Sequence, residues 1–157
     1  MNIIRAIKKG DVEHVAGNMR WSDKVETWAS TQLKPFDVLG KSVALSDQEL
    51  LWAIEYDGEP VAVFGVASGT NGGIPWLLAT DMFATNPAFV KKFPKAYINR
   101  MADKYGRLYN YVHNENRRSK RWLERCGFTV HGPTPFGFGG EPFCYFELEK
   151  GRGINHV

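Results

Sequence analysis

The chain has 157 residues, of which 43% are hydrophobic and 24% are charged, and its net charge is +3. This length is typical of one domain, and the composition excludes disorder as a description of the whole chain. No apolar run approaches the roughly 20 residues of a membrane helix, and the N-terminal sequence MNIIRAIKKG lacks an apolar signal region. The two cysteines lack the spacing of a metal site or a disulfide framework, so we expect no metal centre and a reduced, cytoplasmic compartment.

The first third of the chain predicts a strand followed by three helices. Residues 2–7 are expected to form the strand, and Asp11 is the expected N-cap of the first helix. Ser22 is the N-cap candidate for a second helix, and Pro35 suits the first turn of a third. The core face of the second helix is expected to hold three apolar residues at helical spacing: Val25, Trp28 and Ala29.

A β-hairpin is the clearest feature of the middle of the chain. Two apolar runs, residues 50–56 and 61–67, flank Asp57 and Gly58, a dipeptide typical of two-residue hairpin turns. Residues 74–80 then predict a buried strand. This part of the chain should therefore contribute three consecutive strands to a sheet.

Beyond these strands, helix and strand patterns alternate. Asn86 is a candidate N-cap, and the helix that it begins is expected to kink or restart at Pro94 and to stop at Gly106. The remaining expected elements are a strand at 108–112, a helix at 114–126, a strand from 128 to 131, a loop at 133–140 and a last strand at 143–148.

The element order predicts the fold class. A strand–helix–strand unit over residues 74–112 implies parallel strands joined by a right-handed crossover, whereas the hairpin implies antiparallel pairing. We therefore predict a single α/β domain over residues 1–150, with a mixed sheet of about seven strands and helices on both faces. Residues 151–157 are expected to form a flexible tail.

Residues 109–130 carry the most informative pattern. A strand is followed by Asn116, a small residue at Ser119, bulky residues at Trp122 and Leu123, and a Gly-Phe pair. This pattern resembles the second cofactor motif of the GNAT family of N-acetyltransferases, and the order of elements also matches that fold. The resemblance implies an α/β GNAT-like fold in which acyl-CoA enters a gap between two splayed strands.

That resemblance implies acetyl-CoA as the cofactor and an amine, on a small molecule or a protein, as the acceptor. It also implies a set of cofactor contacts: the backbone of Leu78 and Ala79, which would pair with the pantetheine arm, together with Asn86, Asn116, Ser119 and Trp122. Asn116 also suits a plain helix cap, because asparagine side chains readily accept hydrogen bonds from backbone N–H groups at a helix start.

Two departures from the family pattern bear on activity. Active members carry a glycine-rich loop whose backbone N–H groups hold the pyrophosphate, but residues 79–93 contain no glycine. Many members also have a tyrosine that protonates the departing thiolate, at the position where this chain has Leu123. The sequence is therefore compatible with two interpretations: an active acetyltransferase with a degenerate pyrophosphate loop, and a non-catalytic protein.

A second resemblance is closer. The sequence resembles small GNAT-like proteins of short-tailed bacteriophages in four places: residues 76–81, residues 109–112, the segment around Asn116 and the C-terminal Pro-Phe-x-x-Phe-Glu. That family includes internal virion protein A and proteins described as acetyltransferases. The resemblance implies a phage-encoded protein in the cytoplasm of an infected bacterium, with packaging in the virion left open. The alternatives to an acetyltransferase are then an internal virion or assembly protein and a host-directed inhibitor, with virion or host proteins as partners.

Three further features are candidates for chemistry. Asp81 follows a buried strand, where a carboxylate suits a general base, although a turn residue fits as well. His113 lies at a strand–helix junction and is expected on the surface, with an acid–base role as the alternative. The basic face of the helix at 114–126 suits either solvent or cofactor phosphates. Because no nucleic-acid motif accompanies it, we expect neither nucleic acid nor a membrane as a partner.

Overall fold

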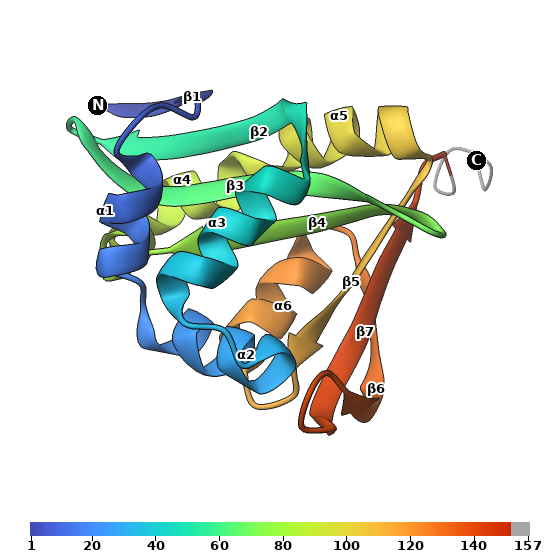
Figure 1. The fold of residues 1–157 in the computed structure, drawn as a ribbon. Helices are drawn as coiled ribbons and strands as arrows, with labels where there is room; N and C mark the ends of the chain where they lie inside the picture. Colours follow the sequence, from blue (N-terminus) through green and yellow to red (C-terminus); the bar gives the residue numbers. More distant parts are fainter. Residues whose placement is uncertain (152–157) are drawn as a thin grey trace.

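The computed structural model describes residues 1–151, which form a mixed seven-stranded sheet in the order β1-β2-β3-β4-β5-β7-β6 (Figure 1). The strands are β1 (Asn2–Ala6), β2 (Ser46–Tyr56), β3 (Glu59–Gly69), β4 (Gly72–Ala79), β5 (Arg107–His113), β6 (Thr129–Phe136) and β7 (Glu141–Glu149). All neighbouring strands are antiparallel except β4 and β5, which are parallel as the crossover predicts.

Helices cover both faces of the sheet. In the view of Figure 1, α1 (Asp11–Gly17), α2 (Trp21–Thr31) and α3 (Pro35–Leu45) lie in front of the strands. The 3₁₀ turn η1 (Asp81–Thr85) and the helices α4 (Pro87–Lys92), α5 (Pro94–Tyr105) and α6 (Arg117–Arg125) belong to the opposite side. The predicted α/β class, the mixed sheet and the helices on both faces are therefore confirmed.

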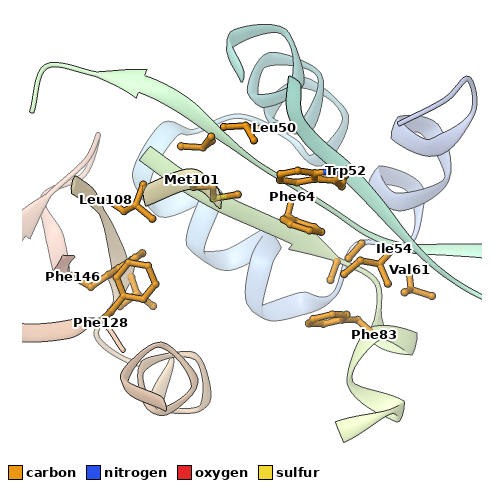
Figure 2. Packing of buried hydrophobic residues seen from close by; sticks show 14 of the residues in the cluster. Leu50, Trp52, Ile54, Val61, Phe64, Phe83, Met101, Leu108, Phe128 and Phe146 are labelled. Atoms are coloured by element: carbon orange, nitrogen blue, oxygen red, sulfur yellow. The ribbon is translucent and has the colours of Figure 1, made fainter. Parts of the chain in front are cut away.

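The sheet separates two apolar cores. The larger core lies between the sheet and α5 and α6, and Trp52, Phe64, Met101, Phe128 and Phe146 belong to it (Figure 2). Within this core, the rings of Trp52 and Phe64 have centroids 5.2 Å apart. The smaller core packs α1 and α3 against the other face of the central strands. Together the two cores fix the central strands β2, β3 and β4.

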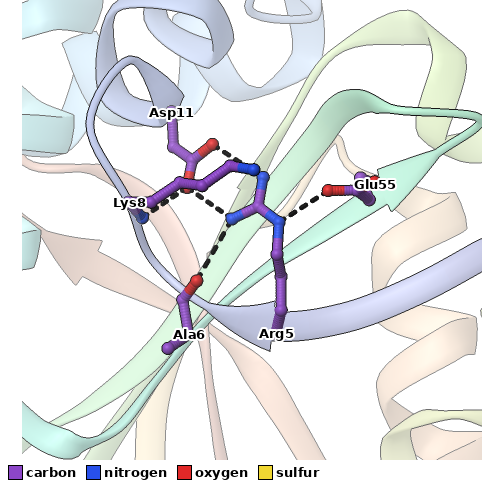
Figure 3. A network of polar contacts seen from close by, with 5 residues as sticks. All are labelled: Arg5, Ala6, Lys8, Asp11 and Glu55. Carbon is purple, nitrogen blue, oxygen red and sulfur yellow. Dashed lines mark hydrogen bonds and ion pairs between the residues drawn. The ribbon is translucent and has the colours of Figure 1, made fainter.

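A polar network ties the first strand to the first helix. The Arg5 guanidinium donates to Asp11 Oδ2 at 2.8 Å and to Glu55 Oε1 at 2.6 Å (Figure 3). Asp11 also accepts from the backbone N–H of Lys8 at 2.7 Å. Burial acts to raise the pKa of Asp11, but these hydrogen bonds hold that pKa below its ordinary value. The N-cap is Gly10, so the prediction of Asp11 as the cap is wrong by one residue.

The second helix differs most from its prediction. The N-cap of α2 is Arg20 and not Ser22, and the exposed fractions of Val25 and Trp28 are 40% and 48%. Of the three predicted core residues only Ala29 is buried. The inward face of α2 instead carries polar residues at positions i, i+3, i+4 and i+7, namely Asp23, Glu26, Thr27 and Ser30. This stripe faces a cavity, which is why the apolar stripe of the helix faces outward.

The hairpin at Asp57–Gly58 and the restart at Pro94 are confirmed, and Gly106 follows α5 with a φ of 74°. The predicted loop at 133–140 is partly wrong, because residues 133–136 extend β6. Prolines are compatible with this position because β6 is an edge strand and one of its sides needs no N–H donors. The predicted tail, residues 151–157, lies outside the described residues except for Gly151. Within residues 1–151 no helix is long and apolar enough to cross a membrane.

Candidate active site between the splayed strands

The central feature of the site is the divergence of β4 from β5. The two strands pair only at Gly73 and Leu108 and then separate (Figure 1). Near that point the side chain of Asn110 crosses the gap and donates to the Pro75 carbonyl at 2.7 Å. Beyond it, towards the carboxyl ends of both strands, the backbone edge of β4 has no neighbouring strand.

The register of β3 and β4 determines which backbone groups face this gap. Thr80 N–H donates to the Val61 carbonyl of β3, and bonding directions alternate along a strand, so Leu78 also bonds towards β3. The groups of Leu77 and Ala79 point the other way. Ala79 already has partners there: its N–H donates to Asp23 Oδ2 at 2.9 Å, and its carbonyl accepts from Arg20 N–H at 2.9 Å. The N–H and carbonyl of Leu77 are directed into the opening.

A cavity of about 240 Å³ occupies the gap. It has room for a small organic group, since one water needs only about 10–15 Å³ on the same measure. The polar stripe of α2 forms one wall, and the inner faces of α5 and α6 form another. The remaining walls come from β4, β5 and the β6–β7 hairpin, so the cavity lies between the two helical layers.

Asp23 is a structural carboxylate in the wall of this cavity. Its exposed fraction is only 3%, and Oδ2 accepts from Arg20 Nε at 2.8 Å as well as from Ala79 N–H. Burial raises the pKa of Asp23, and the charge and hydrogen bond of Arg20 offset part of that effect. Because both partners hold it, Asp23 fixes α2 to the end of β4.

Glu26 is the second carboxylate, one helical turn further along α2. Its Oε1 accepts from the backbone N–H of His113 at 2.8 Å, which ties α2 to the end of β5. Burial raises the pKa of Glu26 from 4.5 to about 6, and the His113 hydrogen bond offsets part of the rise. The nearby charge of Asp23 raises it further. A carboxylate with this pKa can accept a proton near neutral pH.

Glu26 was not identified from the sequence, because the apolar pattern of its helix assigned the opposite face to the interior. The sequence does hold the signal: Asp23, Glu26, Thr27 and Ser30 share one face of the helix. A polar stripe on a helix is usually the solvent face, so only the tertiary structure shows that this stripe lines a cavity.

The six predicted cofactor contacts fall into two groups. Leu78, Ser119 and Trp122 line the cavity, whereas Ala79, Asn86 and Asn116 do not. Both asparagines cap helices, because Asn86 Oδ1 accepts from Phe89 N–H and Asn116 Oδ1 accepts from Ser119 N–H, each at 3.2 Å. The part of these six residues in cofactor binding stays a prediction.

Trp122 forms the part of the cavity wall where α6 meets α4. Its Nε1 donates to the Val90 carbonyl at 3.0 Å, which joins α6 to α4. The Trp122 ring also lies 6.4 Å, between centroids, from Phe93. The segment after β4, where the related fold has its glycine-rich loop, here forms η1 and α4 and packs Phe83 into the core.

Two of the other candidate residues, Asp81 and His113, lie outside the cavity, whereas Cys126 is part of its wall. Asp81 is exposed and borders a shallow pocket that Thr80 and His14 also line. Its catalytic role stays a prediction, and the geometry favours Glu26. The expectation that His113 is a surface residue is wrong: 8% of it is exposed, and its Nε2 lies 3.0 Å from Glu141 Oε1. Burial raises the pKa of Cys126 to about 11, so this thiol is not a ready nucleophile.

The basic face of α6 is largely in solvent, since Arg117, Arg118, Arg121 and Arg125 are exposed. This agrees with a solvated helix face and leaves a contact with cofactor phosphates as a prediction. Among residues 1–151, no group of three or more histidine, cysteine and acidic side chains is placed to hold a metal ion.

The mixed sheet that splits between two parallel strands defines the class of fold, that of the GNAT acetyltransferases. No protein-family model matches the sequence, and no curated protein matches it. Solved structures share the fold at low sequence identity. Spermidine N-acetyltransferase from Vibrio cholerae, in complex with CoA and spermine, is 16% identical with a TM-score of 0.65, over 98% of both chains.

Two more structures show the same likeness. An aminoglycoside acetyltransferase in complex with coenzyme A is 15% identical, with a TM-score of 0.67 over 100% of this chain and 99% of that one. A ribosomal-protein alanine N-acetyltransferase from Escherichia coli is 14% identical, with a TM-score of 0.62 over 95% and 94%. These TM-scores establish the shared fold, and the predicted GNAT-like architecture is confirmed.

Proposed function

We propose that this protein is an N-acetyltransferase that transfers the acetyl group of acetyl-CoA to an amine bound in the cavity between β4 and β5. The observation that carries the proposal is the position of Glu26. It places a half-buried carboxylate, with a pKa raised to about 6, in the wall of a cavity that lies at the strand divergence. The fold supports the same class of reaction, because the similar structures are named as acetyltransferases.

The residues have distinct roles in the proposed reaction. Acetyl-CoA supplies an activated thioester, whose C–S bond breaks as the amine nitrogen forms the new C–N bond. Glu26 accepts the proton that the ammonium group must lose before its nitrogen can attack. The N–H and carbonyl of Leu77 are directed into the opening and can pair with an amide of the pantetheine arm, as a neighbouring strand would. Leu123 cannot protonate the departing thiolate, so in this proposal solvent supplies that proton.

A non-catalytic role is the second candidate. Two contacts favour it: the Asp23 carboxylate accepts from the N–H of Ala79, and the Trp122 side chain in the cavity wall donates to the Val90 carbonyl. A protein that kept the fold but lost the cofactor would retain both contacts. The sequence resemblance to phage proteins adds the finer proposals, namely a phage-encoded protein in the bacterial cytoplasm or virion that acts through assembly or inhibition of a host protein.

Calorimetric titration with acetyl-CoA separates the two candidates. We expect micromolar binding by the wild-type protein, and at least tenfold weaker binding by the variant Ser119→Phe. Ser119 is a half-buried residue in the cavity wall, so a phenylalanine there fills space that the proposal gives to the pantetheine arm.

Ser22→Phe is the matched control, because Ser22 is exposed on α2 and outside the cavity. It should bind acetyl-CoA as the wild type does. Absence of binding by the wild type at millimolar acetyl-CoA would reject the acetyltransferase proposal and leave the non-catalytic role.

A further inference from the structure

The charged side chains in the cavity wall are few, and they carry more negative than positive charge. Only three of its lining residues carry a charge at neutral pH: Arg20, Asp23 and Glu26. Arg20 and Asp23 form an ion pair at 2.8 Å and neutralise each other. Glu26 accepts from the backbone N–H of His113 and forms no ion pair among residues 1–151, although the Asn116 side chain and the charge of Arg20 both act to lower its pKa. The cavity therefore holds one negative charge that lacks a positive partner.

Four aromatic rings line the same cavity as Glu26. Tyr111 and Phe136 stack with centroids 3.8 Å apart, and Phe136 lies 5.3 Å from Phe143. Trp76 is held in place because its Nε1 donates to Ser46 Oγ at 2.7 Å. All four rings line the cavity. A body with apolar surface can pack against these rings and be removed from water.

The β6–β7 hairpin also limits the space that is open along α2. At the tip of the β6–β7 hairpin, Phe138 N–H donates to the Ser30 carbonyl of α2 at 2.9 Å. A Cβ atom at Gly137 would lie 2.7 Å from Ser30 Cα, so the hairpin and helix are already in close contact. This contact joins the two walls beyond Ser30 and limits the length of any molecule that lies along α2.

We propose that the acceptor is a monocationic primary amine on a short apolar or aromatic body, with its ammonium group at Glu26 and its body among Trp76, Tyr111 and Phe136. This inference rests on the proposed function and specifies its substrate class. One free carboxylate balances one ammonium group. Each additional cation would be desolvated in an aromatic cavity with no carboxylate to pair with it, which is costly. Polyamines and aminoglycosides, the substrates in the names of two similar structures, therefore fit poorly.

Direct binding of amines to the full chain, without acetyl-CoA, tests this inference. Phenethylamine is the probe, phenethyl alcohol is its neutral analogue, and spermidine is the polycation. Calorimetry should show saturable phenethylamine binding, with the alcohol and spermidine each at least tenfold weaker. Glu26→Gln should weaken phenethylamine binding at least tenfold. Glu13→Gln, on the exposed face of α1, is the charge control and should leave it unchanged.

The aromatic wall has its own test. Tyr111→Ala should weaken phenethylamine severalfold while ethylamine, which lacks the ring, changes little. Tyr109→Ala, on the same strand but outside the cavity wall, should affect neither amine. The thermal midpoint of each variant shows whether it is folded before its binding is compared.

Each outcome has one meaning. Equal binding of the alcohol, tighter binding of spermidine, or no phenethylamine binding at millimolar concentration would overturn the substrate class. Phenethylamine binding that depends on Glu26, in a protein that does not bind acetyl-CoA, would support the amine site and reject the acetyltransferase. Acetyl-CoA binding with spermidine as the preferred amine would do the reverse.

Discussion

Replacing Glu26 with glutamine should lower kcat/KM for acetyl transfer by about 100-fold or more, since a positioned general base contributes about 10²–10⁴-fold. Glutamine keeps the shape and can still accept from the N–H of His113, but it cannot take a proton. The loss is measured from steady-state rates with acetyl-CoA and phenethylamine, using the appearance of free CoA thiol as the signal.

The pH profile gives this prediction a second readout. Glu26 acts as a base only when deprotonated, and its pKa is raised to about 6. The kcat/KM of the wild type should therefore fall as the pH drops below about 6, and Glu26→Gln should lack that acidic limb. Asp81→Asn is the competing variant. If Asp81 is the base, the large loss and the missing limb will belong to Asp81→Asn, which would contradict the assignment of Glu26.

Replacing Gly72 with alanine should destabilise the protein by about 3 kcal/mol or more, which places it among the severe single substitutions. A Cβ atom there would lie 2.3 Å from the Arg107 carbonyl oxygen, and Gly72 has a φ of +134° that side chains rarely adopt. Arg107 is the first residue of β5, so the added atom would push β5 from β4 at the point where the strands meet. Denaturant unfolding gives the free-energy change.

Gly132→Ala is the matched control for that substitution. Gly132 lies in β6, has an ordinary φ, and an added Cβ would meet no atom within 4 Å. Its free energy of unfolding should change by less than about 0.5 kcal/mol, as for most surface positions. Similar losses for the two variants would mean that the contact of β4 with β5 at Gly72 is not the critical one.

Much of the fold follows from local signals in the sequence. Asp57 and Gly58 have φ values of 50° and 86°, which suit a two-residue hairpin turn. Pro94 and Gly106 begin and end a helix for reasons contained in their own backbones. Such signals place the strands in order, and the helical crossover then requires β4 and β5 to be parallel. The order of elements along the chain and the mixed sheet could therefore be predicted without knowing any side-chain contact, whereas the place of β7 between β5 and β6 was not predicted.

The candidate site depends on contacts that the sequence does not reveal. Glu26 meets His113 across 87 positions of the chain, and Asp23 meets Ala79 across 56. The apolar stripe with Val25 and Trp28 gave the wrong inward face, because a cavity with polar walls reverses the usual orientation of a helix. Asp81 was chosen from its place after a strand, but only the tertiary structure separates it from the cavity.

A crystal structure with bound acetyl-CoA would locate the cofactor directly. We expect the pantetheine arm between β4 and β5, an amide of that arm paired with the backbone of Leu77, and the thioester in the cavity that Glu26 lines. The Trp122 side chain should have left the Val90 carbonyl to admit the arm. Cofactor bound elsewhere on the surface, with the Trp122–Val90 hydrogen bond intact and the cavity empty, would contradict the account.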